Sequence, residues 1–126
     1  MLQDRSHLRA RAALVVLITL QVVMLGALYA QVAPHPPRAV APFALGPFLG
    51  GSLSIALAAL VLDGSRSRGG MICSFLAAAT ALVSFGPHKW LDAAIGEIWP
   101  AVLVAQIAVA VLVIEVVRNW RESAAG

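Results

Sequence analysis

Apolar residues fall in four long runs along the chain, separated by short polar segments. The runs cover residues 12–33, 43–62, 70–85 and 98–117. None of them alternates apolar and polar positions with a period of two, so the pattern excludes half-buried β-strands. The hydrocarbon core of a bilayer is about 30 Å thick, and about 20 apolar residues in a helix cross it. The pattern therefore predicts four transmembrane helices.

The segments between the runs contain residues that stop helices. Pro34 and Pro37 follow the first run, Gly64 follows the second and Pro87 follows the third. Proline has no backbone N–H and glycine favours turns, so each segment predicts a short connection. Because a chain in lipid must satisfy its own backbone hydrogen bonds, we expect an all-α integral membrane four-helix bundle that forms one domain over residues 1–126.

The composition agrees with this prediction and excludes several other classes. The 126 residues have a mass of 13.1 kDa, and 60% are hydrophobic while 12% are charged. A soluble domain carries about 25% charged residues, and one this small has too little interior to bury so many apolar side chains. Cys73 is the only cysteine, which excludes an intramolecular disulfide and a paired-cysteine metal motif. A soluble enzyme, a disordered tail and a disulfide scaffold are therefore not expected.

The basic residues predict how the chain is oriented. With the N-terminus in the cytoplasm, seven arginines lie on the cytoplasmic side: Arg5, Arg9, Arg11, Arg66, Arg68, Arg118 and Arg121. Only Arg38 and Lys89 lie on the other side, and cytoplasmic loops carry an excess of Lys and Arg. We therefore expect a multi-pass protein of the bacterial inner membrane with both termini in the cytoplasm. The alternative is that the first run belongs to a cleaved signal peptide. The apolar region of a signal peptide has about 7–15 residues, however, and the first run is longer.

Aromatic residues mark the two expected membrane surfaces. Tyr29, Trp90 and Trp99 fall at the outer boundary and Trp120 falls at the inner one, where amphipathic rings are enriched. Residues 88–96 have the pattern of a short amphipathic helix in the head-group layer. The net charge of +3 is spread over small groups of arginines, which suits anionic lipids at the cytoplasmic face and does not predict nucleic-acid binding.

Small residues recur every four positions in the second and third runs. These helix-packing positions are Gly46, Gly50, Ser54, Ala58, Gly70, Ser74 and Ala78. Small side chains let helix backbones approach closely in lipid, where no hydrophobic force drives helices together. These residues form one stripe along each helix, and two roles are possible for the stripes. They pack the second helix against the third, or they contact another chain.

Two glutamines lie near the middle of the first and last runs. Antiparallel helices would bring Gln21 and Gln106 to the same depth. An interhelical hydrogen bond contributes about 0.6 kcal/mol on average in a membrane protein, and this packing role is the prediction for both glutamines. The alternative is a polar site for a solute at mid-membrane, which Ser52, Ser54 and Thr80 would complete.

Glu115 is the one acidic residue inside a predicted span. It lies near the cytoplasmic end of the last run, and Arg118 follows one helical turn later. A carboxylate in this position can reach the head groups, so we expect an ion pair between the two side chains.

Motifs that carry chemistry are few. His35, His88 and Asp92 lie on the outer side, but their spacing is too common to predict a metal site. None of the four runs contains a histidine that could ligate haem. We therefore expect no catalytic residue and no cofactor. The predicted function is a small accessory or structural subunit that packs against other membrane protein chains and lipid. The first alternative is a small oligomeric transporter or channel, and a more remote one is a lipid-modifying enzyme.

Overall fold

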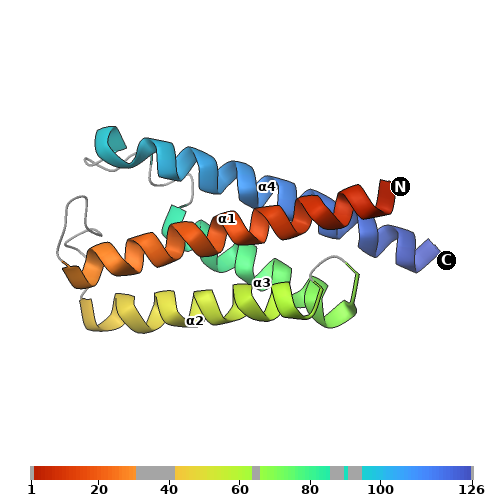
Figure 1. Ribbon diagram of the computed structural model, residues 1–126, viewed down its shortest axis with the longest axis horizontal. Coiled ribbons are helices and arrows are strands. Elements are labelled where there is room, and N and C mark those ends of the chain that lie inside the picture. Colours follow the sequence, from red (N-terminus) through yellow and green to blue (C-terminus); the bar gives the residue numbers. More distant parts are fainter. Residues whose placement is uncertain (1, 31–41, 64–65, 86–89, 91–94, 126) are drawn as a thin grey trace.

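The computed structural model describes all residues except 1, 31–41, 64–65, 86–89, 91–94 and 126. The described part of the chain folds into four α-helices and contains no strand (Figure 1). The helices are α1 (Leu2–Ala30), α2 (Pro42–Val61), α3 (Arg68–Phe85) and α4 (Ile95–Ala125). The prediction of an all-α fold with four helices is confirmed.

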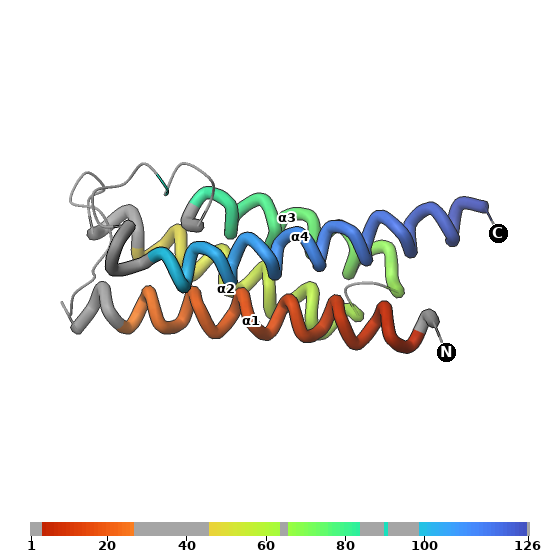
Figure 2. Tube along the Cα trace, turned by 90° about the horizontal axis from the view of Figure 1, so that it is seen from above, coloured from red at the N-terminus to blue at the C-terminus, as the bar shows by residue number. Residues whose placement is uncertain are grey.

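Helices that follow each other in sequence also pack against each other, and α4 closes the bundle against α1. Both chain termini lie at one end of the bundle, and the turn between α2 and α3 lies at the same end (Figures 1 and 2). We call this the terminal end. The arrangement is an up-and-down bundle in which neighbouring helices are antiparallel.

The helices at the terminal end are longer than the apolar runs. α1 begins at Leu2, well before residue 12, and α4 continues to Ala125, well beyond residue 117. Arginine, glutamate and leucine all favour the helical conformation, so a helix continues where an apolar run stops. The last residues of the run 12–33, and most of the segment 88–96, lie outside the described residues.

The core lies between the four helices and is built mainly from leucine, valine and alanine. The largest fully buried apolar side chains are Leu14, Leu17, Leu49, Leu112, Val102 and Val116. α3 contributes smaller residues, including the buried Ala77, Ala78 and Ala81. Alanine lets the backbone of α3 approach its neighbours closely, which increases dispersion contacts between the helices.

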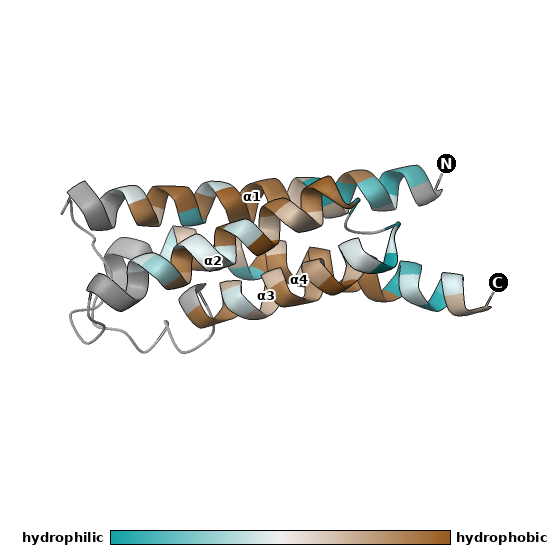
Figure 3. Ribbon diagram, turned by 90° about the horizontal axis from the view of Figure 1, so that it is seen from below, coloured by the Kyte–Doolittle hydropathy of each residue, from teal (hydrophilic) through white to brown (hydrophobic). Residues whose placement is uncertain are grey.

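Many large apolar side chains point out of the bundle. Val61 is 83% exposed, and Val83 and Ile114 are each 60% exposed. Figure 3 shows hydrophobic residues along the middle of the helices and hydrophilic ones gathered near both termini. Two helices contain a stretch long and apolar enough to cross a membrane, namely Asp4–Gly26 in α1 and Trp99–Ala125 in α4. The apolar stretches of α2 and α3 are shorter.

Close backbone contacts hold the turn between α2 and α3. After α2, Asp63 adopts a left-handed conformation with a φ of 63°. Ser67 caps the start of α3, because its Oγ accepts a hydrogen bond from the backbone N–H of Gly70 at 2.9 Å. A Cβ atom on Gly70 would lie 2.6 Å from the carbonyl oxygen of Asp63, so this position requires glycine. The turn therefore holds its polar residues in one place at the terminal end.

Candidate functional site

A chain of side-chain hydrogen bonds crosses the interior of the bundle between α1, α2 and α3. Gln21 donates from Nε2 to Ser52 Oγ at 2.6 Å, and Ser52 donates its hydroxyl to Thr80 Oγ1 at 2.8 Å. Thr80 in turn donates to the backbone carbonyl of Ala77 at 3.1 Å. Each hydroxyl therefore has an acceptor, and three helices are joined by one continuous polar connection. Ser52 and Thr80 are two of the residues that the sequence associates with Gln21.

One atom in this connection has no partner. Gln21 is fully buried, and its Oε1 accepts no hydrogen bond. An unsatisfied buried polar atom costs about 1–3 kcal/mol. Gln21 is thus held through its amide NH₂ group alone, and Oε1 is an open acceptor inside the bundle.

Gln106 lies apart from this connection. Its Oε1 accepts a hydrogen bond from Nε1 of Trp90 at 3.2 Å, in an exposed part of the surface. Each glutamine therefore bonds to a residue outside its own helix, but the partners are Ser52 and Trp90 rather than the other glutamine. The two glutamines do not form one polar site.

A second polar cluster surrounds Glu115, where α1 packs against α4. Glu115 is only 4% exposed. Its Oε2 accepts the hydroxyl of Ser6 at 2.5 Å, and its Oε1 lies 3.4 Å from Nη1 of Arg9. The expected partner Arg118 is present, at 4.0 Å from Oε2. The expected extension of the carboxylate towards the surface is not found, because α1 covers Glu115 and supplies closer donors.

Ser6 is a partner of Glu115 that was not expected, although the sequence carries a signal for it. Ser6 continues, at helical intervals, the buried face that α1 forms with Ala10, Ala13 and Leu17. A polar residue on the inner face of a helix needs a partner on a neighbouring helix. Glu115 is that partner.

Polar and charged side chains also connect α1 to the turn between α2 and α3. Nδ1 of His7 lies 2.7 Å from Oδ1 of Asp63, and Arg66 donates to Oδ1 of Asp4 at 2.9 Å. The pair between Arg66 and Asp4 is exposed, and such pairs contribute between 0 and about 1 kcal/mol. The main effect of these contacts is to position α1 relative to the turn between α2 and α3, and their contribution to stability is small.

The small residues of α2 and α3 lie in different surroundings. All three members of the α3 stripe are buried, namely Gly70, Ser74 and Ala78. In α2, Gly46 is buried and Ala58 is half-buried, whereas Ser54 is exposed. A Cβ atom at Gly50 or at the exposed Gly51 would meet no atom within 4 Å. The middle of the α2 stripe therefore borders open space.

The face of α2 that packs inside the bundle lies beside this stripe. It consists of the buried residues Leu49, Ser52, Ala56 and Ala59. We call the surface formed by the half-buried Gly50 and the exposed Gly51 and Ser54 the α2 outer stripe.

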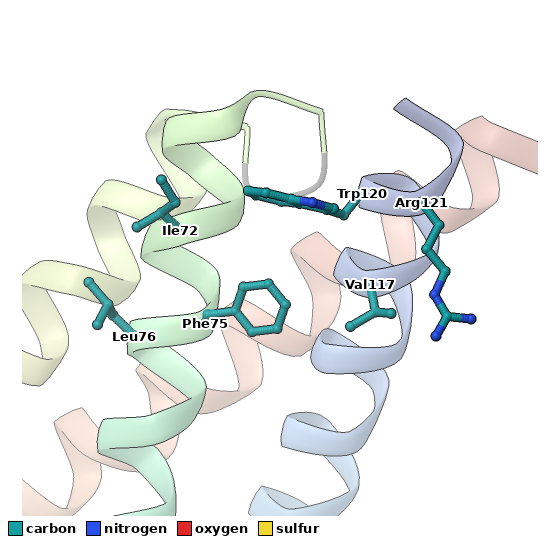
Figure 4. A pocket seen from close by; sticks show the side chains of 6 residues that line it. All are labelled: Ile72, Phe75, Leu76, Val117, Trp120 and Arg121. Carbon is teal, nitrogen blue, oxygen red and sulfur yellow. The ribbon is translucent and has the colours of Figure 1, made fainter. Parts of the chain in front are cut away.

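An apolar groove lies between α3 and α4 near the terminal end. Its volume is about 360 Å³, and three residues from each helix line it: Ile72, Phe75, Leu76, Val117, Trp120 and Arg121 (Figure 4). We call it the α3–α4 groove. The predicted interfacial residues Trp90, Trp99 and Trp120 are all partly exposed, and the side chain of Tyr29 lies outside the described residues.

The described residues contain no set of three His, Cys, Asp or Glu side chains that could hold a metal ion. His35, His88 and Asp92 lie outside the described residues. No family model matches the sequence, and neither a curated protein nor a solved structure is significantly similar to the chain.

Proposed function

We propose that the chain is a small multi-pass protein of the bacterial inner membrane that acts as an accessory or structural subunit of a membrane protein assembly. Its membrane location is supported by the large apolar side chains on the outside of the helices, such as Val83 and Ile114. Such extensive apolar exposure is unfavourable in water, whereas lipid tails accept it.

The proposed orientation places the terminal end in the cytoplasm. Both termini and the turn between α2 and α3 lie at that end (Figure 2). The arginines there include Arg9, Arg66, Arg68, Arg118 and Arg121. Cytoplasmic segments of inner-membrane proteins carry such an excess of positive charge.

The α2 outer stripe is the observation that supports a subunit role. Gly50 and Gly51 have no atom within 4 Å of an added Cβ, and Ser54 is exposed and bonds only to its own helix, at the carbonyl of Gly50. Small residues that face outwards allow a second helix to approach the backbone of α2 closely. Such close contact supplies the dispersion energy that associates helices in lipid. A transmembrane helix of another chain is the partner that fits.

The test is gentle detergent extraction from native membranes followed by native mass spectrometry. The wild-type chain should leave the membrane with at least one other protein chain attached. Gly50→Leu should lose that chain, because leucine fills the stripe and keeps the helices apart. Val22→Leu is the matched control, since it enlarges an exposed apolar residue of α1. A wild-type protein that is always a lone monomer would contradict the proposal.

Transport of a polar solute is a second candidate, and the free Oε1 of Gln21 favours it. This atom is a buried acceptor without a donor, as a solute site would require. Vesicles that contain the purified protein should then show solute flux that Gln21→Met abolishes. Equal leakage with and without the protein would exclude this candidate and leave the subunit role in place.

A further inference from the structure

We propose that the α3–α4 groove binds an acyl chain of an anionic phospholipid, whose phosphate is held by Arg68 and Arg121. The inference rests on the membrane location proposed above. It adds a specific site and a ligand of stated chemistry to that proposal.

The walls of the groove suit a hydrocarbon chain. Ile72 and Leu76 are each about half exposed, and Phe75 and Trp120 lie between the two helices (Figure 4). Five of the six lining residues carry apolar side chains, with Val117 completing the α4 side. Water in such a groove would have few hydrogen-bond partners, so an apolar occupant is favoured.

Two positive charges flank this apolar surface. Arg121 lines the groove on α4, and Arg68 lies one helical turn before Ile72 on α3. Neither arginine has an acidic partner within the described part of the chain. Their neighbours Arg66 and Arg118 differ, since both lie within ion-pair distance of carboxylates. The free guanidinium groups are thus available to phosphate, to which arginine can donate two parallel hydrogen bonds.

The combination of groove and charges selects one kind of ligand. A free phosphate ion would bind the arginines but leave the groove uncovered. An apolar helix would fill the groove but leave Arg68 and Arg121 without counter-charge. A phospholipid with an anionic head group satisfies both, because its chain and its phosphate are joined at the depth where Trp120 marks the membrane surface.

Fluorescence quenching of Trp120 tests the proposal directly, because bromine atoms on an acyl chain quench a tryptophan that they contact. All variants carry Trp90→Phe and Trp99→Phe, so that Trp120 is the only tryptophan. The full chain is reconstituted in phosphatidylcholine vesicles that contain either dibrominated phosphatidylglycerol or dibrominated phosphatidylcholine at the same mole fraction. Phosphatidylglycerol should quench Trp120 more strongly.

Variants of the arginines identify the source of this preference. Arg121→Gln and Arg68→Gln should each weaken the preference for phosphatidylglycerol about tenfold, because each removes charge-assisted hydrogen bonds to the phosphate. Arg5→Gln and Arg11→Gln are matched controls, because they remove the same charge from exposed positions on α1 that do not line the groove. They should leave the preference unchanged, and an excess of inorganic phosphate should not abolish it.

Three results would overturn the proposal. The first is equal quenching by the two lipids, and the second is an equal effect of Arg5→Gln and Arg121→Gln, which would show only general attraction to a charged surface. The third is loss of the preference in inorganic phosphate, which would identify a site for a free anion. Flotation with the vesicles separates the two proposals. If the protein floats with the vesicles but shows no preference for phosphatidylglycerol, only the lipid site is contradicted. If the protein does not float, the proposed membrane location is contradicted as well.

Discussion

At the scale of single residues, the buried carboxylate of Glu115 depends more on a hydroxyl than on its arginines. Ser6 donates to it inside the bundle at 2.5 Å, whereas Arg9 and Arg118 are about half exposed and lie 3.4 and 4.0 Å away. A hydrogen bond to a charged group contributes about 1.5–3 kcal/mol, whereas an ion pair whose arginine is half exposed is screened by solvent and contributes about 1 kcal/mol or less. Ser6→Ala should therefore lower the free energy of unfolding by about 2 kcal/mol, and Arg118→Gln by less than about 1 kcal/mol. Denaturant titration in mild detergent, followed by circular dichroism, measures both. A larger loss for Arg118→Gln would show that charge, not the hydroxyl, holds Glu115.

The connection from Gln21 through Ser52 to Thr80 makes a second prediction at this scale. Ser52→Ala would leave both polar atoms of the buried Gln21 amide without partners, because Oε1 already has none. It should cost about 1–3 kcal/mol of stability. Gln21→Met removes the whole amide at similar volume, and Ser52 keeps its bond to Thr80, so this change should cost less. In the double variant, the cost of Ser52→Ala should shrink. The same unfolding titration measures all three variants. If the costs of the two single changes simply add in the double variant, the proposed connection between Gln21 and Ser52 is contradicted.

At the scale of elements, the turn between α2 and α3 depends on one of two adjacent glycines. A Cβ atom on Gly70 would lie 2.6 Å from a backbone oxygen, whereas one on Gly69 would lie 3.7 Å from the side chain of Leu62. Gly70→Ala should destabilise the protein by about 1–3 kcal/mol, because the backbone must move to relieve the overlap. Gly69→Ala is the matched control and should be neutral or stabilising by up to about 1 kcal/mol, since alanine favours the helix. Thermal melting followed by circular dichroism compares the two. Equal melting temperatures of the two variants would show that the backbone of Asp63 does not lie close enough to Gly70 to exclude a side chain.

At the scale of the whole molecule, the arrangement of the helices predicts which ends share a compartment. In a Cys73→Ser background, a cysteine at Ser123 lies near the C-terminal end of α4, and one at His35 lies in the segment that the sequence assigns to the outer side. A membrane-impermeant maleimide should label His35→Cys in spheroplasts, whereas Ser123→Cys should react only after the inner membrane is opened. Labelling of Ser123→Cys alone in sealed spheroplasts would reverse the proposed orientation. Labelling of both cysteines would place them on the same side of the membrane and would exclude an even total number of spans.

The pattern of the sequence was sufficient for the number and order of the helices. Four apolar runs and their breakers, such as Pro34 and Gly64, correspond to the four helices of the structure. Long apolar runs are reliable signals of helices when they show no period of two, because a strand is much shorter than such a run. The pairing of Glu115 with Arg118 could also be predicted, since it depends only on positions one turn apart.

The sequence could not specify which side of each helix faces the bundle. Apolar residues surround these helices, so the pattern gives no direction from core to surface. Packing of the four helices alone brings Ser6 to Glu115 and Ser52 to Gln21, although these pairs are far apart in the chain. It also buries one face of α2 and leaves Gly51 and Ser54 exposed. Local composition is sufficient to form a helix, but the contacts between helices depend on shape and on polar partners that meet only in three dimensions.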